Sequence, residues 1–268
     1  MTAVVDRHPE HAAIAAEVRS WYHQSYPEMG YLAEEREFGW YRRMLRRNDV
    51  QLKRIGPTDL PPLLLDVRDY FGDADVRIVI DDRQADRTLT GPLAAAGWQA
   101  VRSDVFHAYV GAPPRAPDVK GLAVEPASAE TAALYVATRI RAFANSEDEP
   151  PAEDIEAEAR QRRAEMTGDG RFFIARIGGE AAGIIGWYEG ADRFVFQLGT
   201  RLPFRRRGIA RKLLCDLLAD SSDRGYRSVV INADEADWPV TYYKRLGFRD
   251  EVYWHREYGI KATSKSSG

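Results

Sequence analysis

Apolar residues in the second half of the chain recur at spacings that indicate a mixture of strands and helices. Helical spacing is clearest after Ile209, where Leu213 and Leu217 continue one apolar face. Gly178 and Gly179 separate two apolar runs and favour a two-residue hairpin turn. The expected strands are 122–126, 171–177, 181–189, 193–200, 228–232 and 251–258, and the expected helices are 128–145, 155–166, 239–247 and one that opens at 209.

These elements follow the order β-α-α-β-β-β-α-β-α-β. Three consecutive strands cannot belong to a doubly wound, all-parallel sheet, so the order predicts an α/β fold with a mixed sheet (α+β mixed sheet). The first half ends in a similar way, with a strand at 76–80, an acidic loop at 81–86, a short helix at 90–98 and a strand at 104–110. Two interpretations stay open: a degenerate internal repeat, and a chance likeness of two β-α-β pieces.

A segment from Gly111 to Gly121 separates the two halves, because its three prolines fit neither a helix nor a central strand. We therefore expect an N-terminal α/β domain at 1–115 and a second domain at 120–260. The first domain contains an aromatic stretch that we expect on its first helices, where the rings would line an acceptor pocket or, more simply, pack in a core. These aromatic residues are Trp21, Tyr22, Tyr26, Tyr31, Phe38, Trp40 and Tyr41.

Charge and composition exclude several classes of protein. The chain has 268 residues and a formal net charge of −3, which is a poor electrostatic match for nucleic acid. Its one cysteine, Cys215, lies among leucines, so we expect a buried thiol and no disulfide. No window approaches ~18 consecutive apolar residues, and the N-terminus lacks the apolar segment of a signal peptide. We expect a cytoplasmic protein without nucleic-acid or membrane partners.

Three arginines and a glycine stand directly before the apolar face that begins at Ile209, in the run FRRRGIARKLL from Phe204 to Leu214. A helix N-terminus presents unpaired N–H groups and a partial positive charge, which bind an anion when no side chain blocks the approach. Gly208 leaves that approach open. A solvated arginine cluster is the alternative, but the helix dipole disfavours cations there, so a bound anion explains them better.

The run R-x-x-G-x-A (Arg205, Gly208, Ala210), preceded by LGT and followed downstream by YYKRLGF, resembles the acyl-CoA motif of the GCN5-related N-acetyltransferases (GNAT). The resemblance covers about residues 121–258 and implies the GNAT acyl-CoA N-acyltransferase fold with an additional N-terminal α/β domain. It also implies acetyl-CoA as co-substrate, with its pyrophosphate on the loop amides and its pantetheine arm along the preceding strand. The cofactor-binding residues that it implies are Leu198, Gly199, Thr200, Arg205, Arg206, Arg207, Gly208, Ile209, Ala210 and Arg211.

Tyr243 matches the family's tyrosine that is proposed to protonate the departing CoA thiolate, and Tyr242 beside it is expected in the core. Many family members carry a glutamate on the strand before the phosphate loop, where this chain has Gln197 and no carboxylate. An acceptor amine that loses its proton to water would need no such base. Acidic residues that could act at a distance, and are more simply loop charges, are Glu189, Asp234 and Glu235.

An acidic loop between the first two expected helices of the second half would attract a cationic acceptor, or would simply favour the start of a helix. The five histidines show no metal-ligand pattern, so we predict no metal, and His255 is read as a strand residue. The acids of this loop are Glu147, Asp148, Glu149, Glu153 and Asp154.

Taken with the resemblance, these residues predict an acetyl-CoA-dependent N-acetyltransferase that acts on the primary amine of a small molecule by direct attack. The acceptor is a small-molecule amine, for which a cationic compound is one option, and the protein is a monomer or a homodimer. A non-catalytic acyl-CoA sensor or interaction module is the alternative, which the missing strand carboxylate keeps open.

Overall fold

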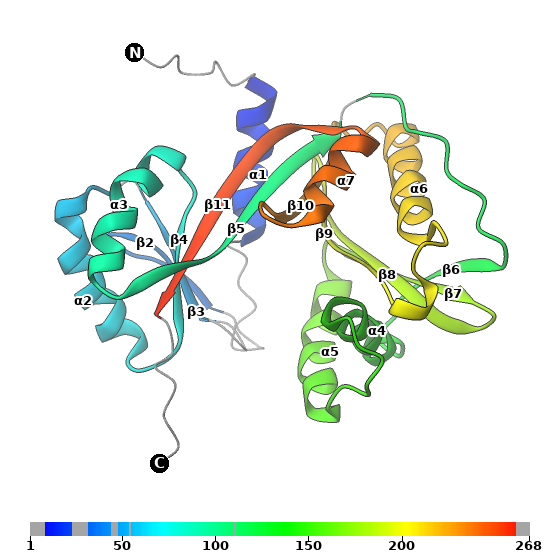
Figure 1. Cartoon of the computed structure of the whole chain (residues 1–268), viewed down its shortest axis with the longest axis horizontal. Helices are drawn as coiled ribbons and strands as arrows, with labels where there is room; N and C mark the ends of the chain where they lie inside the picture. Colours follow the sequence, from blue (N-terminus) through cyan, green and yellow to red (C-terminus); the bar gives the residue numbers. More distant parts are fainter. Residues whose placement is uncertain (1–8, 23–31, 44–47, 54, 110, 261–268) are drawn as a thin grey trace. The chain divides into compact units, whose positions relative to one another are not determined.

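The computed structural model describes residues 9–22, 32–43, 48–53, 55–109 and 111–260. Contacts group the chain into two compact units (Figure 1). The first unit comprises residues 1–106, 233–242 and 251–268, and the second comprises residues 107–232 and 243–250. Strands β5 (Trp98–Tyr109) and β11 (Phe248–Ile260) therefore carry residues of both units. Separable domains at 1–115 and 120–260 stay a prediction.

The sheet of the first unit has the order β1-β2-β3-β4-β11-β5. Its first three strands are antiparallel, and the fourth is parallel to the third. The chain's last strand, β11, lies against β4 in antiparallel register from Arg256–Ile80 to Gly259–Arg77. The strands not yet bounded are β1 (Leu32–Glu35), β2 (Gly39–Arg43), β3 (Asn48–Leu52) and β4 (Val76–Ile80).

Two helices, α2 (Leu60–Phe71) and α3 (Arg83–Ala95), lie on one side of the strands of this unit (Figure 1). Leu63 of α2 and Leu93 of α3 are fully buried in one core with Ile78. A short 3-10 turn, Pro57–Asp59, precedes α2, and the helix α1 (Pro9–Tyr22) contributes Ile14, Ala15 and Val18 to the buried residues.

Two sequence predictions for the first half are corrected. The expected acidic loop at 81–86 is mostly the first turn of α3, because Asp82 caps the helix by accepting hydrogen bonds from the N–H groups of Gln84 and Ala85 at 2.8 and 2.7 Å. Trp40 and Tyr41 lie on the strand β2 and not on a helix, so one is half-buried and the other fully buried. Tyr26, Tyr31 and the side chains of Trp21 and Tyr22 lie outside the described residues.

In the second unit, β6 (Leu122–Pro126), β7 (Gly170–Ile177), β8 (Glu180–Glu189) and β9 (Arg193–Thr200) are antiparallel neighbours. The strand β10 (Val229–Asp234) lies parallel to β9. Figure 1 shows two helices together on one face of this sheet and a third on the other. They are α4 (Ala132–Ala144) and α5 (Ala152–Thr167), and opposite them α6 (Ile209–Asp223), while α7 (Trp238–Leu246) follows β10.

The helices of the second unit begin and end close to the predicted residues. α4 starts at Ala132 and not at Ser128, because the hydroxyl of Thr131 accepts the N–H of Ser128 at 2.8 Å and holds a turn before the helix. Asn145 ends α4 in the left-handed conformation, with φ of 53°. The face of α6 is buried as expected, and Cys215 on it is 1% exposed. Burial raises the pKa of that thiol, which fits a structural role.

Both halves repeat one order of elements, three antiparallel strands, a helix, a strand parallel to the third, a helix and a last strand. In the first half these are β1, β2, β3, α2, β4, α3 and β5, and in the second β7, β8, β9, α6, β10, α7 and β11. The internal repeat is therefore confirmed at the level of the fold. Among the described residues, every helix is too short or too polar to cross a lipid bilayer.

Candidate functional site

The strands β9 and β10 diverge. Their parallel register runs from Arg193 to Val195 on β9, whereas the antiparallel register of β9 with β8 continues to Thr200. A shift in the β8 register between Gly186 and Trp187 marks the place where β9 bulges. The last residues of β9 thus extend beyond their pairing with β10. A gap of this kind between parallel strands suits an extended ligand that can pair with backbone groups.

Backbone groups at the end of β9 alternate in direction. The N–H of Arg201 donates to the carbonyl of Ala182 on β8 at 2.9 Å. In an antiparallel pair the groups of every second residue turn to the same side, so those of Gly199 face β8 and those of Leu198 and Thr200 face away from it. The carbonyl of Thr200 also accepts a hydrogen bond from Arg205 at 3.0 Å. The use of Leu198 and Thr200 as backbone partners of a ligand stays a prediction.

Gly199, also implied as a cofactor-binding residue, is required by the packing of α4. A Cβ atom at this position would lie 3.0 Å from the Cβ of Ala142 and 3.3 Å from the ring of Phe143, both on α4. These contacts are tighter than side chains normally allow. The close packing of α4 on β9 thus accounts for the glycine without a ligand.

The loop before α6 places a glycine at the helix N-terminus. Gly208 is the N-cap residue with φ of 83°, and no side chain caps the helix there. The first-turn N–H groups of an α-helix have no partner within the helix, which leaves those of Ile209, Ala210 and Arg211 directed outward. Arg206 and Arg207 beside them are exposed. Uncapped amides with guanidinium groups next to them are the groups that bind anions in proteins, and the predicted role of this loop stays a prediction.

Arg205 is exposed like its two neighbours, but its guanidinium donates hydrogen bonds to other groups of the protein. It donates to the carbonyl of Thr200 at 3.0 Å, to the carbonyl of Ala142 at 2.8 Å and to the side-chain oxygen of Asn145 at 2.5 Å. These bonds tie the loop to the end of β9 and to the C-terminal end of α4. The structure gives Arg205 a positioning role in addition to its predicted place in the loop.

A hollow of about 530 Å³ lies beside α6. It brings Arg211 and Lys212 of the helix next to Arg115 and Asp118 of the proline-rich segment. Lys212 forms an ion pair with Asp216 at 2.6 Å, so Arg115 and Arg211 supply the excess positive charge that favours an anionic occupant. Sequence reasoning missed Arg115 and Lys212, and the cation within the proline-rich segment was the available signal.

Tyr243 lies on α7 with 9% of its surface exposed, and its ring packs against Phe248 with the centroids 6.1 Å apart. Tyr242 is half-buried and contacts the ring of Trp238. The core position thus belongs to Tyr243 rather than to Tyr242, contrary to expectation. A buried phenol can still donate a proton at its hydroxyl end, so its catalytic role stays a prediction.

Gln197, which stands on β9 where many family members carry a glutamate, takes part in a buried hydrogen bond. The hydroxyl of Tyr135 on α4 donates to the side-chain oxygen of Gln197 at 2.7 Å. Burial is the largest cause that raises the pKa of Tyr135, so the phenol stays neutral. Neither group is a base at neutral pH.

The three distant acids have other partners. Glu189 forms ion pairs with Arg171 and Arg193, both at 3.1 Å. Burial by itself raises the pKa of Glu235, but hydrogen bonds from the indole of Trp254 and the guanidinium of Arg83 outweigh it and leave that pKa lowered. Asp234 accepts the N–H of Ala236 at 3.0 Å. These contacts fit structural charges better than a catalytic base.

Two acids of the loop between α4 and α5 are paired within the second unit. Glu147 forms an ion pair with Arg201, and Glu149 with Arg141. Glu153 and Asp154 lie in the first turn of α5, where acids favour the helix. The attraction of this loop for a cationic acceptor is therefore smaller than its sequence indicates.

A family model described as an acetyltransferase (GNAT) domain matches residues 132–264. Among solved structures, a GCN5-related N-acetyltransferase from Kribbella flavida is 19% identical, and the match covers 92% of this chain and 95% of that one with a TM-score of 0.62. A second, from Sphaerobacter thermophilus, is 20% identical over 83% of this chain and 76% of that one, with a TM-score of 0.59.

A tandem GNAT protein from the clavulanic acid biosynthesis pathway is similar over both halves. It is 14% identical, and the match covers 83% of this chain and 78% of that one with a TM-score of 0.57. Identities this low show a common fold and leave the substrate open. The predicted fold class, a mixed α/β sheet of the GNAT kind with an additional N-terminal α/β domain, is confirmed.

Proposed function

Since a family model of the GNAT acetyltransferase domain matches residues 132–264, we propose that this protein transfers an acetyl group from acetyl-CoA to the primary amine of a small molecule. The amine nitrogen attacks the thioester carbonyl directly. A C–N bond forms, the C–S bond breaks, and CoA leaves as a thiolate. The same proposal includes a small-molecule amine as the acceptor, a monomer or a homodimer as the oligomeric state, and a cytoplasmic location.

The uncapped N-terminus of α6 is the observation that carries this proposal. Its first-turn amides and the exposed Arg206 and Arg207 suit the two charges of a pyrophosphate. The hollow lined by Arg115, Arg211 and Lys212 begins on the same helix and suits a further phosphate of the nucleotide. A pantetheine arm has amide groups of its own, which would pair with the outward backbone groups of Leu198 and Thr200 as an added strand does.

Tyr243 is proposed as the general acid for the CoA thiolate. Proton transfer from a phenol of pKa ~10 to the thiolate of a thiol of pKa ~8.5 is thermodynamically unfavourable. The hydroxyl of Tyr243 must therefore lie in contact with the sulfur, so that proximity offsets this cost. Gln197 on β9 is an amide that accepts a hydrogen bond from Tyr135, so it does not act as a base. The acceptor ammonium therefore loses one proton to water before it attacks, and the nitrogen releases its second proton to water as the C–S bond breaks.

The test is a calorimetric titration of the full chain with acetyl-CoA and with free CoA, followed by an assay of thiol release with a panel of amines. We expect micromolar binding of both, on the order of −8 kcal/mol, and thiol release that depends on the amine. No binding of either compound contradicts the proposal.

A non-catalytic acyl-CoA sensor is the second candidate, favoured by the absence of a carboxylate on β9. Tyr243→Phe separates the two. An enzyme should lose thiol release by at least ~10-fold while it keeps its affinity for CoA, whereas a sensor releases no thiol with or without the hydroxyl. Tyr242→Phe on the same helix is the matched control and should leave both properties unchanged.

A further inference from the structure

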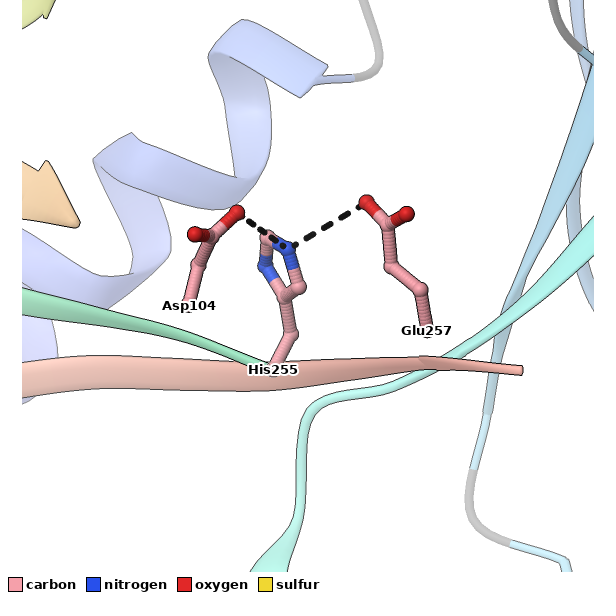
Figure 2. Close-up of side chains that lie close together, drawn as sticks. All are labelled: Asp104, His255 and Glu257. Carbon is pink, nitrogen blue, oxygen red and sulfur yellow. Dashed lines mark ion pairs between the residues drawn. The ribbon is translucent and has the colours of Figure 1, made fainter. Parts of the chain in front are cut away.

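Three buried side chains with metal-binding chemistry meet in the first unit. Asp104 lies on β5, and His255 and Glu257 lie on the neighbouring strand β11. Two residues that are two positions apart on a strand point to the same face. Figure 2 shows all three side chains on one side of the strands, with His255 between the two carboxylates. The topology thus brings Asp104 next to a histidine and an acid that follow it about 150 residues later in the sequence.

The separations between the donor atoms are those that a metal ion requires. The Nε2 atom of His255 lies 3.4 Å from Oδ2 of Asp104 and 3.8 Å from Oε1 of Glu257, and the three ligand atoms all lie within 4.8 Å of one another. Zinc binds histidine nitrogen and carboxylate oxygen at about 2.0–2.2 Å, so two ligands of a tetrahedral ion are about 3.4 Å apart. An ion at the centre needs only small side-chain adjustments.

The surroundings also favour a cation. The three side chains are 6%, 4% and 7% exposed. Two carboxylates this close repel each other in a buried environment, and a divalent ion would neutralise both.

We propose that Asp104, His255 and Glu257 bind a divalent transition-metal ion, for which Zn²⁺ is the best-fitting occupant. The ion cross-links β5 to β11 and thereby fastens the last strand of the chain into the sheet of the first unit. Arg102 donates from Nε to both oxygens of Asp104 at 2.9 Å and orients this ligand. A fourth position is left for a water or a second carboxylate oxygen. Mg²⁺ is disfavoured, since it prefers six oxygen ligands.

This site is independent of the proposed acyl transfer, and it changes the prediction that the chain binds no metal. The histidines were judged by their spacing from one another, which hides a site built by one histidine and two acids from two strands. Only the spacing of His255 and Glu257, two positions apart on one strand, is visible in the sequence.

The experiment uses the full chain without a histidine tag, stripped with a chelator and then dialysed against Zn²⁺ or Mg²⁺. We expect one Zn²⁺ per chain by elemental analysis, a higher unfolding temperature with Zn²⁺ than with Mg²⁺, and a visible spectrum of tetrahedral Co²⁺ when Co²⁺ replaces Zn²⁺. The proposal is overturned if the wild-type chain takes up no Zn²⁺ at micromolar concentration.

His255→Gln and Glu257→Gln should each weaken Zn²⁺ binding by more than ~10-fold. The matched control is Glu251→Gln on the same strand, whose side chain is 44% exposed and pairs with Arg83. His11→Gln tests for binding at a surface histidine. Equal binding by the site variants and the control would overturn the proposal. If the site variants do not fold, the wild-type Co²⁺ spectrum decides: a tetrahedral spectrum that persists in His11→Gln supports the site, and its absence overturns it.

Discussion

Gly208 and Gly225 stand at the two ends of α6, and both have a positive φ, 83° and 74°. Only Gly208 borders the proposed pyrophosphate site. A Cβ atom would meet only ordinary contacts at 3.7 Å at Gly208 and nothing within 4 Å at Gly225. The cost of a side chain at either position is therefore backbone strain rather than a clash.

Gly208→Ala should lower the free energy of unfolding by about 1–2 kcal/mol and the affinity for acetyl-CoA by at least ~10-fold, because the loop must move to relieve the strain. Gly225→Ala should show a similar loss of stability and unchanged affinity. Denaturant unfolding and calorimetry measure the two quantities. Equal loss of affinity in both variants would mean that the effect is one of stability alone.

Gln197 leads to a prediction about pH. Without a carboxylate on β9, the rate at low amine concentration should rise about tenfold per pH unit below the pKa of the acceptor, which is ~10.4 for a lysine-like amine. In Gln197→Glu the carboxylate can still accept the hydrogen bond from Tyr135, and it adds a base. We expect this variant to reach its plateau at a lower pH in assays of thiol release. A wild-type rate that is flat between pH 6 and 9 would indicate a base elsewhere.

The helices α2 and α6 occupy the same place in the two repeats and differ in their first turns. α6 begins with Ile209, Ala210 and Arg211, which all have an N–H group, whereas α2 begins with Leu60, Pro61 and Pro62. Proline has no N–H, so two of the three first-turn donors are missing from α2. The N-terminus of α2 therefore lacks the amide donors that we propose for pyrophosphate binding at α6.

The expected stoichiometry follows from this difference. The full chain should bind one acetyl-CoA, and Gly208→Ala should weaken that single site without revealing a second one of similar affinity. Isothermal titration with protein at concentrations well above the dissociation constant determines the number of sites. A value of two would show that the first repeat binds the cofactor by contacts other than helix amides.

At the scale of the whole molecule, the last strand of the chain completes the sheet of the first unit. β4 pairs with β11 over four residues, from Ile80 with Arg256 to Arg77 with Gly259. The fully buried Tyr258 of β11 belongs to the same core as Leu63 and Leu93. A fragment that contains only the first half of the chain therefore lacks β11, which lies between β4 and β5 in the sheet.

A fragment of residues 1–115 should show no cooperative unfolding transition. The same fragment with residues 248–260 attached through a flexible linker should regain one, since it restores the partner of β4 and the core residue Tyr258. Circular dichroism during thermal unfolding distinguishes the two. If the short fragment unfolds cooperatively, residues 1–115 are a separable domain as the proline-rich boundary predicts.

The sequence by itself determined most elements of the second half and the place where α6 begins. The strands 76–80 and 193–200 were predicted with the bounds that the structure has, because local apolar spacing and turn residues specify them. Gly208 could be identified because an anion that approaches the N–H groups of a helix start needs a residue without a side chain there. The acyl-CoA motif is likewise contiguous, so it can be read without knowledge of distant contacts.

Only the tertiary structure decided which distant residues meet. Arg205 bonds to Ala142 and Asn145, Gln197 is engaged by Tyr135, and Asp104 lies beside His255. Local spacing carries no information on these pairs, because the paired residues are 60 to about 150 positions apart along the chain. Likewise, Tyr243 rather than Tyr242 is the buried tyrosine of α7, since which side of a short helix is covered depends on the elements that pack against it.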